Sequence, residues 1–531
     1  MREHWGSRWG FILAVAGSAV GLGNIWKFPF ICGMNGGGAF VILYILCVLF
    51  VGFPLLLAEL TLGRAAQRSA VGAFAKMTKA KTVFSDGLGV LLVALGAVLL
   101  IFKHWGYGTF CLTAGISLLL FGWKTVGFIS GMVIPVIITG YYAVIGGWTL
   151  IYMGKAFLGQ LNFNDQTGAE AVMGPIASAS NGMMGWVIAS SILFLLLCGG
   201  VVFSGVQKGI ERWSKVLMPM LFVLLIVLIC RGLSLPGAMK GVKWFLSPDF
   251  SKLNADSVIA AMGHSFFSLS LAMGIVLTYG SYLSKKENIV QSAVSILVLD
   301  TTAALMAGLA IFPALFAMGF KETSGPVLIY EILPAAFNQL PAGWLWNGLF
   351  FMMISVAALT SGMSLLEPPV RIFTDEFKMK RKNAIFLTLL MILVIAVVCS
   401  ISMANWNNFP RLHAFLLKVW NNDLSGSMFG MLDSFACNWL LPLCGFMLAV
   451  YVGWTWGARK ALKELREGTS PAIDGNLWLR LAGIKDEGGS GGRKVSLFSF
   501  SVIWGFFIRL VTPILVFIAF LDVIGVIKFT A

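Results

Sequence analysis

Apolar runs of about 20 residues recur along most of the chain, and short polar stretches separate them. Each run can cross the hydrocarbon core of a bilayer as one helix. A closed β-barrel would need short alternating segments, and runs such as 185–204 do not alternate. The pattern predicts an all-α polytopic membrane protein with about eleven spans, near 8–34, 38–66, 125–158, 184–204, 211–233, 256–283, 288–319, 343–374, 383–404, 430–456 and 497–527.

Residues 83–122 form a further apolar stretch, which Lys103 and His104 interrupt. They fit two extra short spans, or a re-entrant or interfacial hairpin, because 88–102 is short for a bilayer roughly 30 Å thick. We expect a helical hairpin in the membrane. A hairpin leaves the orientation of every later span unchanged.

Charge is scarce and placed on one side of these spans. The 531 residues are 58% hydrophobic and 11% charged, with a formal net charge of +15. Lys and Arg gather in the loops 64–81, 208–215, 285–286, 371–382 and 459–494. This asymmetry predicts that these loops and the N-terminus are cytoplasmic, with the C-terminus outside. No nucleic-acid motif accompanies the basic loops, so we expect no nucleic-acid partner.

The domain organisation follows from the spans. We expect one transmembrane domain over 1–531, and the Gly-Gly-Ser-Gly-Gly run at 488–492 predicts a flexible linker over 457–496 before the last span, 497–527. No Ser–His–Asp arrangement and no metal-ligand cluster emerges, and the chain has only four histidines. We therefore expect no enzymatic activity.

Two spans contain breaks. In the first, Gly17, Gly21 and Gly23 precede Asn24, and in the sixth a serine pair stands at 268 and 270. Glycine costs a helix about 1 kcal/mol relative to alanine, so the first stretch unwinds easily. Packing through small residues would explain Gly17 and Gly21 but not Asn24 at the same depth. Broken helices at matching places in two five-helix halves, 8–233 (with the insertion 83–122) and 256–456, indicate a transporter binding site.

At these breaks the chain resembles the neurotransmitter:sodium symporter family, in particular its bacterial amino-acid members. The resemblance rests on 2–5, 19–24, 28–29, 35–40, Glu59 with Gly63-Arg64, Tyr141-Tyr142, 208–212, 266–271 and 359–361, and covers the chain apart from 83–122. It implies the leucine-transporter fold of inverted five-helix repeats, in a multi-pass protein of the bacterial inner membrane. It also implies sodium-coupled symport of a neutral, hydrophobic L-amino acid by alternating access. A non-transporting amino-acid sensor or channel on the same fold is the alternative, and the oligomeric state stays open.

The resemblance implies two Na⁺ sites built from oxygen atoms. One uses carbonyls of Gly17, Val20 and Ala357 with the hydroxyls of Thr360 and Ser361. Residues 357, 360 and 361 share one helical face, although both hydroxyls could instead bond to carbonyls of their own helix. The other site uses Ala19, Asn24, Ser268 and Asp300.

Asp300 departs from the family, which commonly has Asn there. A carboxylate within a span is expensive, so we expect it ionised and facing Na⁺, the alternative being a protonated, hydrogen-bonded Asp. His264, where the family often has Gln, either pairs with Asp300 or is a satisfied neutral core histidine. The positions that hold Cl⁻ in chloride-dependent members are here Tyr44, His264, Ser268, Asp300 and Ala304. Because Ala304 offers no hydrogen bond, we expect no chloride.

By the same resemblance, N–H groups near Leu22 and Gly23, with the Tyr142 hydroxyl, hold the substrate carboxylate. Carbonyls around Ala19, Phe267 and Ser270 meet its amino group. Its side chain contacts Ile138, Phe267, Met273, Ser361 and Leu365. No charge points at that side chain.

Two gates are implied. Lys27 and Asp433 resemble the outer ion pair, with Lys where the family usually has Arg, and Phe267 with Tyr142 forms a lid over the substrate. On the cytoplasmic side Arg2 and Asp375 resemble a latch, surrounded by Trp5, Ser281 and Tyr282.

Overall fold

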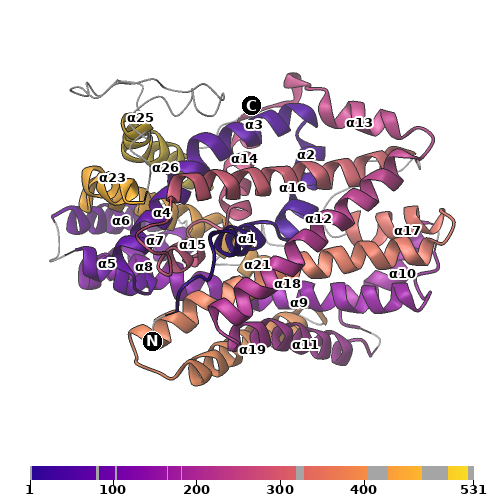
Figure 1. The fold of residues 1–531 in the computed structure, drawn as a ribbon, viewed down its shortest axis with the longest axis horizontal. Coiled ribbons are helices and arrows are strands. Elements are labelled where there is room, and N and C mark those ends of the chain that lie inside the picture. The colour runs from indigo at the N-terminus through magenta and orange to yellow at the C-terminus, as the bar shows by residue number, and fades with distance from the viewer. Residues whose placement is uncertain are drawn as a thin grey trace.

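The protein is described by a computed structural model, which covers residues 3–78, 83–101, 105–163, 165–180, 182–317, 328–404, 428–468 and 500–523. Helices dominate these residues, and no β-strand occurs among them (Figure 1). Nine of the described helices are long and apolar enough to cross a membrane, namely Gly38–Ala66, Lys124–Phe157, Met184–Phe203, Val206–Leu233, Ile289–Ala317, Gly343–Asp375, Arg381–Met403, Met428–Thr455 and Ile503–Val523. The prediction of an all-α polytopic membrane protein is confirmed.

Several of these spans consist of two or more α-helical segments that wider helical turns join. The helices that make up these spans are α3 (Gly38–Cys47), α4 (Phe53–Ala66), α8 (Lys124–Phe128), α9 (Ile134–Phe157), α11 (Met184–Phe203), α12 (Arg212–Leu233), α16 (Ile289–Ala317), α18 (Gly343–Asp375), α19 (Arg381–Ala404), α21 (Met428–Ser434), α22 (Leu441–Val450), α25 (Phe500–Phe506) and α26 (Thr512–Val523). Short helices α5 (Ala70–Met77), α10 (Gln166–Ala177), α13 (Ala238–Leu246) and α17 (Leu333–Asn338) lie between spans. In Figure 1, α5 lies at the same end as the N-terminus, and α10 and α17 lie at the opposite end.

The first span is broken. Helix α1 (Arg8–Ala19) ends where Val20 leaves the helical region at ψ 86°, and the chain resumes in a wide turn, Gly23–Lys27, followed by α2 (Phe28–Met34). The two halves are bent by 49°. The glycine-rich stretch therefore unwinds as its composition predicts.

The sixth span is broken as well. It consists of α14 (Ala255–Ser268) and α15 (Ile275–Gly280). Between them Ser270, Ala272 and Gly274 adopt positive φ angles of 53°, 61° and 69°. Left-handed backbone at two residues other than glycine is costly, so the surrounding structure must hold this stretch in place.

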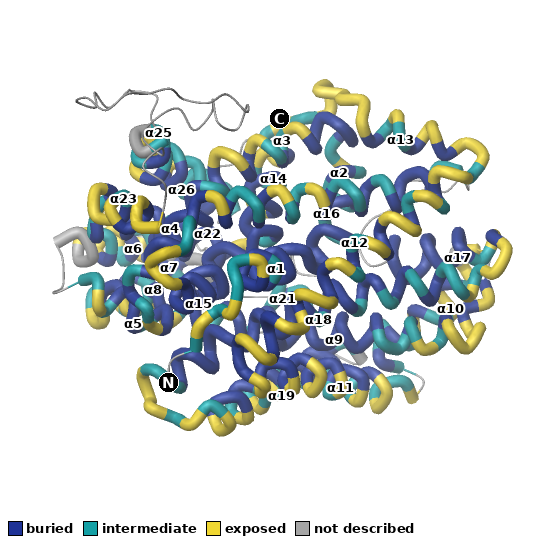
Figure 2. Tube along the Cα trace, viewed as in Figure 1, coloured by how far each residue is buried: buried dark blue, intermediate teal, exposed yellow. Residues whose placement is uncertain are grey.

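Burial follows the membrane pattern. Helix α9 packs along α18 in the centre, and most residues of both helices are buried (Figure 2). The peripheral helices α11, α12 and α19 expose large apolar side chains such as Leu193, Val223 and Phe386. Apolar side chains on the outer surface of such a helix bundle face lipid.

The insertion forms two helices, α6 (Val83–Ile101) and α7 (Trp105–Phe121). They lie so close that a Cβ on Gly96 would stand 2.7 Å from the Leu112 nitrogen. Phe110 of α7 packs on Phe435 and Trp439, at ring-centroid distances of 5.7 and 5.4 Å. The hairpin is thus attached to the bundle.

The first part of the flexible linker expected over 457–496 is a helix. Residues Ala458–Arg466 form α23, which buries Ala458, Ala461 and Leu465. Apolar residues at this spacing face one side of a helix. The fully buried Arg64 at the end of α4 donates to Glu464 at 2.8 Å and so attaches α23 to the bundle. The remainder, 469–496, lies outside the described residues.

Candidate substrate and sodium sites

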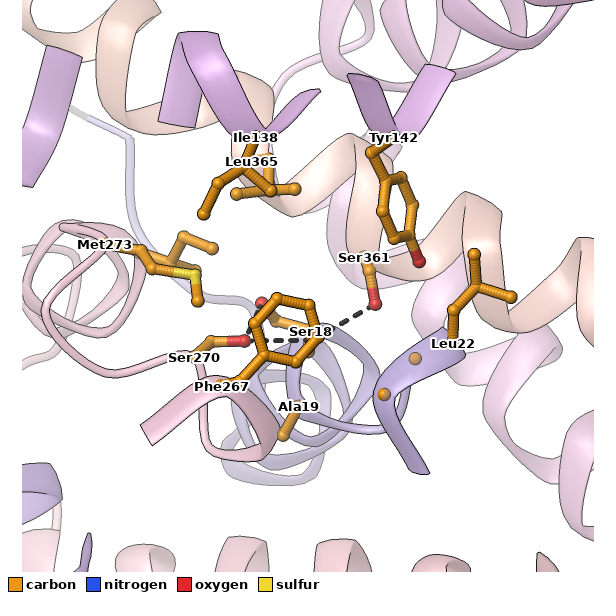
Figure 3. Close-up of a pocket in the computed structure, with 13 residues that line it drawn as sticks. Ser18, Ala19, Leu22, Ile138, Tyr142, Phe267, Ser270, Met273, Ser361 and Leu365 are labelled. Carbon is orange, nitrogen blue, oxygen red and sulfur yellow. Dashed lines mark hydrogen bonds between the residues drawn. The ribbon is translucent and has the colours of Figure 1, made fainter. Parts of the chain in front are cut away.

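A cavity lies where the two broken spans meet α9 and α18 (Figure 3). All the residues predicted to contact substrate line it, and so do Ser18, Gly21 and Ile275, which the sequence reasoning did not name. The lining is Ser18, Ala19, Gly21, Leu22, Gly23, Ile138, Tyr142, Phe267, Ser270, Met273, Ile275, Ser361 and Leu365. None of these side chains carries a charge.

Glycines let the segments approach one another. A Cβ on Gly21 would stand 2.3 Å from Ser361 Oγ, and one on Gly23 would stand 2.9 Å from Phe267 Cδ1. Real Cβ atoms do not come so close, and larger residues would push the segments apart. The glycines therefore serve the close contact as well as the unwinding.

Polar groups converge on the break in the first span. The Ser18 carbonyl accepts hydrogen bonds from Ser270 Oγ at 3.0 Å and from Ser361 Oγ at 3.1 Å (Figure 3). Ser18 Oγ donates to Ser270 Oγ at 3.1 Å. The Tyr142 hydroxyl is buried and makes no hydrogen bond within the described part of the chain. It is available to a ligand.

The cavity is small in this structure. Its volume is about 20 Å³, room for about one water molecule. An amino acid therefore fits only after the lining side chains move apart. Met273, with three rotatable bonds, is the most adaptable of them.

Three of the four residues predicted for the first sodium site, Asn24, Ser268 and Asp300, are brought together. Asp300 in α16 accepts from Asn24 Nδ2 at 2.7 Å and from Ser268 Oγ at 2.9 Å. Tyr44 donates to both Ser268 Oγ, at 3.0 Å, and Asp300, at 3.3 Å. All four residues are buried, and the described residues place no cationic side chain within 4.0 Å of Asp300. A buried carboxylate without a cation is the chemistry that suits Na⁺.

His264 does neither of the two things expected of it. Neither ring nitrogen has a hydrogen-bond partner within the described residues, so the pairing with Asp300 is not formed. The ring instead stacks on Phe28 at 5.7 Å and lies 5.2 Å from Tyr44. Neighbouring aromatic rings hold the imidazole in this position.

The predicted second sodium site also assembles in part. Thr360 Oγ1 and the Ala357 carbonyl are 3.0 Å apart, and a Cβ on Gly17 would stand 3.5 Å from Thr360 Cβ. Val20 is buried where α1 ends, at the break in the first span. Thr360 bonds to carbonyls of its own helix, as the alternative reading of its hydroxyl allows, whereas Ser361 reaches across to Ser18. Oxygen donors from two spans thus meet beside Gly17, and this donor set fits a hard cation.

Comparison with known proteins shows the family of the chain. The model of the "Sodium:neurotransmitter symporter family" matches residues 2–103 and 176–481. The chain belongs to the sodium:neurotransmitter symporter family. Over 99% of its length this symporter is 33% identical to YhdH of Bacillus subtilis, an uncharacterized sodium-dependent transporter covered over 98%. An uncharacterized sodium-dependent transporter of Haemophilus influenzae is 30% identical, covering 88% of this chain and 93% of its own.

A solved structure has the same fold as this chain. The symporter superposes on MhsT, crystallised in complex with L-phenylalanine, with a TM-score of 0.75 and 33% identity, over 98% of this chain and 100% of that one. The predicted leucine-transporter fold is confirmed. The protein is a sodium-dependent membrane transporter for a small molecule and not an enzyme.

The outer gate of the symporter does not form an ion pair in this structure. Lys27 and Asp433 both line a vestibule of about 190 Å³ beside Phe267 and Tyr142. No ion pair within 4.0 Å joins them among the described residues, and the Lys27 ammonium instead lies 4.9 Å from the centre of the Phe267 ring. Lys27 thus contacts Phe267 of the predicted lid, and its ion pair with Asp433 stays a prediction.

The residues predicted to surround the cytoplasmic latch lie together. Trp5 donates to the Tyr279 carbonyl at 3.0 Å and packs 6.3 Å from the Tyr282 ring. Ser281 is buried beside them. Asp375 pairs with Arg371 of its own helix at 3.1 Å. Its predicted partner, Arg2, lies outside the described residues.

Two buried carboxylates, Glu211 and Glu59, have structural roles that were not predicted from the sequence. Glu211 accepts from Gly6 N at 2.7 Å and from Ser7 Oγ at 2.8 Å, which anchors the N-terminal segment. Glu59, fully inside the bundle, accepts from Ala272 N at 2.6 Å and from Leu277 N at 3.2 Å. The position of Glu59 in the middle of an apolar span was the one signal in the sequence that pointed to its structural role.

Replacing Glu59 with Ala is expected to destabilise the symporter more than Glu59→Gln does. Alanine leaves two buried N–H groups of the unwound stretch without partners, at a cost of about 1–3 kcal/mol each. Glutamine keeps one oxygen that can accept. Thermal unfolding of the purified protein measures the difference, with the partly exposed Glu467→Ala as the control. An alanine variant that melts with the wild type contradicts this role.

Proposed function

We propose that the protein couples Na⁺ entry to the uptake of a neutral L-amino acid with a hydrophobic side chain. The cavity lining carries this proposal, because it offers polar backbone at the breaks and no charged side chain. A second carboxylate or an amine on the substrate side chain would be buried without a partner there. MhsT, which has the same fold, was crystallised with L-phenylalanine.

The two ends of the cavity have different chemistry. Near Leu22 and Gly23 the chain re-enters a helix, where N–H groups attract a carboxylate, and the Tyr142 hydroxyl is available beside them. At the other end Ile138, Met273 and Leu365 form an apolar wall (Figure 3). An amino acid therefore fits with its backbone toward the break and its side chain toward the wall.

Two Na⁺ ions are proposed, one at each cluster of oxygen donors. Asn24, Ser268 and Asp300, with the Ala19 carbonyl, would hold the first. The second would rest on Gly17, Val20, Ala357, Thr360 and Ser361. Bound Na⁺ would supply positive charge that stabilises the buried carboxylate of Asp300 and ties the broken first span to its neighbours. Chloride is not required in this proposal.

The basic loops support an orientation with the N-terminus in the cytoplasm, in the inner membrane of a bacterium. Two inverted repeats, 8–233 and 256–456, then provide alternating access around the cavity. The vestibule beside Lys27 would open to the outside and the region around Trp5 to the inside.

Uptake into proteoliposomes tests the proposal. Labelled neutral amino acids should accumulate against their gradient only when an inward Na⁺ gradient is imposed, and choline should not replace Na⁺. Phenylalanine or leucine should compete, and glutamate and lysine should not. A channel would equilibrate substrate without accumulating it, and a sensor would bind without uptake. Either result, or glutamate or lysine as the best competitor, overturns the proposal.

Replacing Met273 with Ala is expected to shift preference toward bulkier side chains such as tryptophan. The shorter side chain widens the cavity at its apolar wall and removes contacts with small substrates. The affinity for small substrates should fall about tenfold for each 1.4 kcal/mol lost. Competition assays measure the ratio of affinities. Met262→Ala, a buried methionine of α14 outside the cavity, is the control. Equal shifts in both variants would contradict a role in substrate selection.

A further inference from the structure

A groove runs between α9 and α11, at the end of the molecule opposite the N-terminus (Figure 1). Its volume is about 480 Å³, within the range of about 300–1,000 Å³ typical of ligand sites. Its lining includes Lys155, Leu158, Gln160, Trp186 and Leu193. None of these residues belongs to the substrate or sodium sites.

The groove faces the surroundings of the bundle and not its interior. Leu158, Trp186 and Leu193 are 73%, 68% and 50% exposed, respectively. Apolar side chains this exposed on membrane-spanning helices are covered by lipid. Tryptophan near the end of a span is typical of the level of the lipid headgroups.

One positive charge lines this apolar groove. Lys155 lies in the last turn of α9 and forms no ion pair with any acidic side chain in the described part of the chain. The backbone N–H of Gln160 donates to the Lys155 carbonyl at 2.8 Å, so the turn brings Gln160 back toward the lysine, and Gln160 lines the groove as well. The groove therefore combines an apolar wall with a cation and an amide at its polar end.

We propose that this groove binds an anionic phospholipid from the leaflet opposite the N-terminus. One acyl chain lies along the apolar wall, and Lys155 and Gln160 hold the phosphate. Charge complementarity decides the occupant, because an apolar peptide would leave the ammonium unpaired and a soluble anion would leave the wall uncovered. The proposal stands independently of the transported substrate.

The bound lipid would rest on a contact that reaches the substrate site. Ser190 lines the groove, and its Oγ is 2.7 Å from the place where a Cβ on Gly147 of α9 would stand. One turn farther along α11, the Phe194 ring lies 6.2 Å from the Tyr142 ring. Filling the groove would therefore reinforce the packing that positions Tyr142.

Photo-crosslinking in nanodiscs tests the site. The full-length protein is placed in phosphatidylcholine doped with phosphatidylglycerol or phosphatidylcholine that carries a photoreactive acyl chain, and labelled peptides are mapped by mass spectrometry. Phosphatidylglycerol is expected to label 150–160 and 183–193 at least fivefold more than phosphatidylcholine does. Equal labelling by the two lipids in the wild type overturns the proposal.

Two matched pairs of variants locate the label. A Cβ at Gly154 or at Gly200 meets nothing within 4 Å, so a Phe side chain starts without a clash at both, yet only Gly154 lines the groove. Gly154→Phe should abolish the label and Gly200→Phe should keep it. Lys155→Gln should lower phosphatidylglycerol labelling about fivefold, as expected for one lost surface charge, and leave phosphatidylcholine unchanged. Lys240→Gln, an exposed lysine elsewhere, should have no effect.

Label that persists in Gly154→Phe, or falls equally in the two lysine variants, contradicts the site. Melting temperature and monodispersity verify that each variant is folded. Should Gly154→Phe fail to fold, the lysine pair and the comparison of the two lipids in the wild type still decide.

Discussion

Replacing Thr360 with Val and Ser361 with Ala together is expected to abolish sodium-dependent substrate binding while the protein stays folded. Valine preserves the shape of threonine and removes only its oxygen. Each lost contact with a charged group costs about 1.5–3 kcal/mol, which is about ten- to a hundredfold in affinity. The Na⁺ concentration that gives half-maximal amino-acid binding should therefore rise at least tenfold for Thr360→Val alone. In the double variant, binding should become undetectable.

The control is a threonine with the same local bonding away from the site. Thr388 Oγ1 in α19 donates to the Ala384 carbonyl at 2.8 Å and is fully buried. Thr388→Val should leave the Na⁺ dependence unchanged. Because Ser361 also lines the substrate cavity, Thr360→Val separates loss of Na⁺ from loss of substrate contact. Wild-type uptake that continues undiminished in choline would remove the basis of this prediction.

Much of the fold follows from the length and spacing of apolar runs. The first break could be located because glycines weaken a helix wherever they cluster, whatever their neighbours. The residues that face the cavity could be named because the family resemblance indicates which side of each helix lines the substrate site. The structure brings Ile138, Phe267 and Leu365 to the same cavity from spans far apart in the sequence.

Other features depend on contacts that no local pattern encodes. Glu59 holds a stretch more than 200 residues away through backbone N–H groups, which any residue except proline possesses. His264 is positioned by the rings of Phe28 and Tyr44, and it makes no hydrogen bond to Asp300. Lys27 lies over the Phe267 ring because both reach the same vestibule. In each case the partner is chosen by tertiary packing.

Transport is expected to be independent of chloride, with Asp300 supplying the negative charge that an anion would bring. Ala304, one turn beyond Asp300, is buried and offers no hydrogen bond. Two like charges about 4 Å apart repel by about 4 kcal/mol at an effective dielectric constant of 20. The nitrogens of His264 make no hydrogen bond to Asp300 within the described residues. Uptake should be unchanged when gluconate replaces chloride.

Asp300→Asn should lower uptake at least tenfold, because the amide keeps the hydrogen bonds to Asn24 and Ser268 only in part and removes the charge that faces Na⁺. Adding Ala304→Ser supplies the missing hydroxyl, so the double variant should recover uptake only when chloride is present. Ala304→Ser alone is the control and should stay insensitive to chloride, since Asp300 still repels the anion. Uptake measured in chloride and in gluconate for the four proteins gives the comparison. A wild-type protein that loses uptake in gluconate would show that Asp300 does not take the place of the anion.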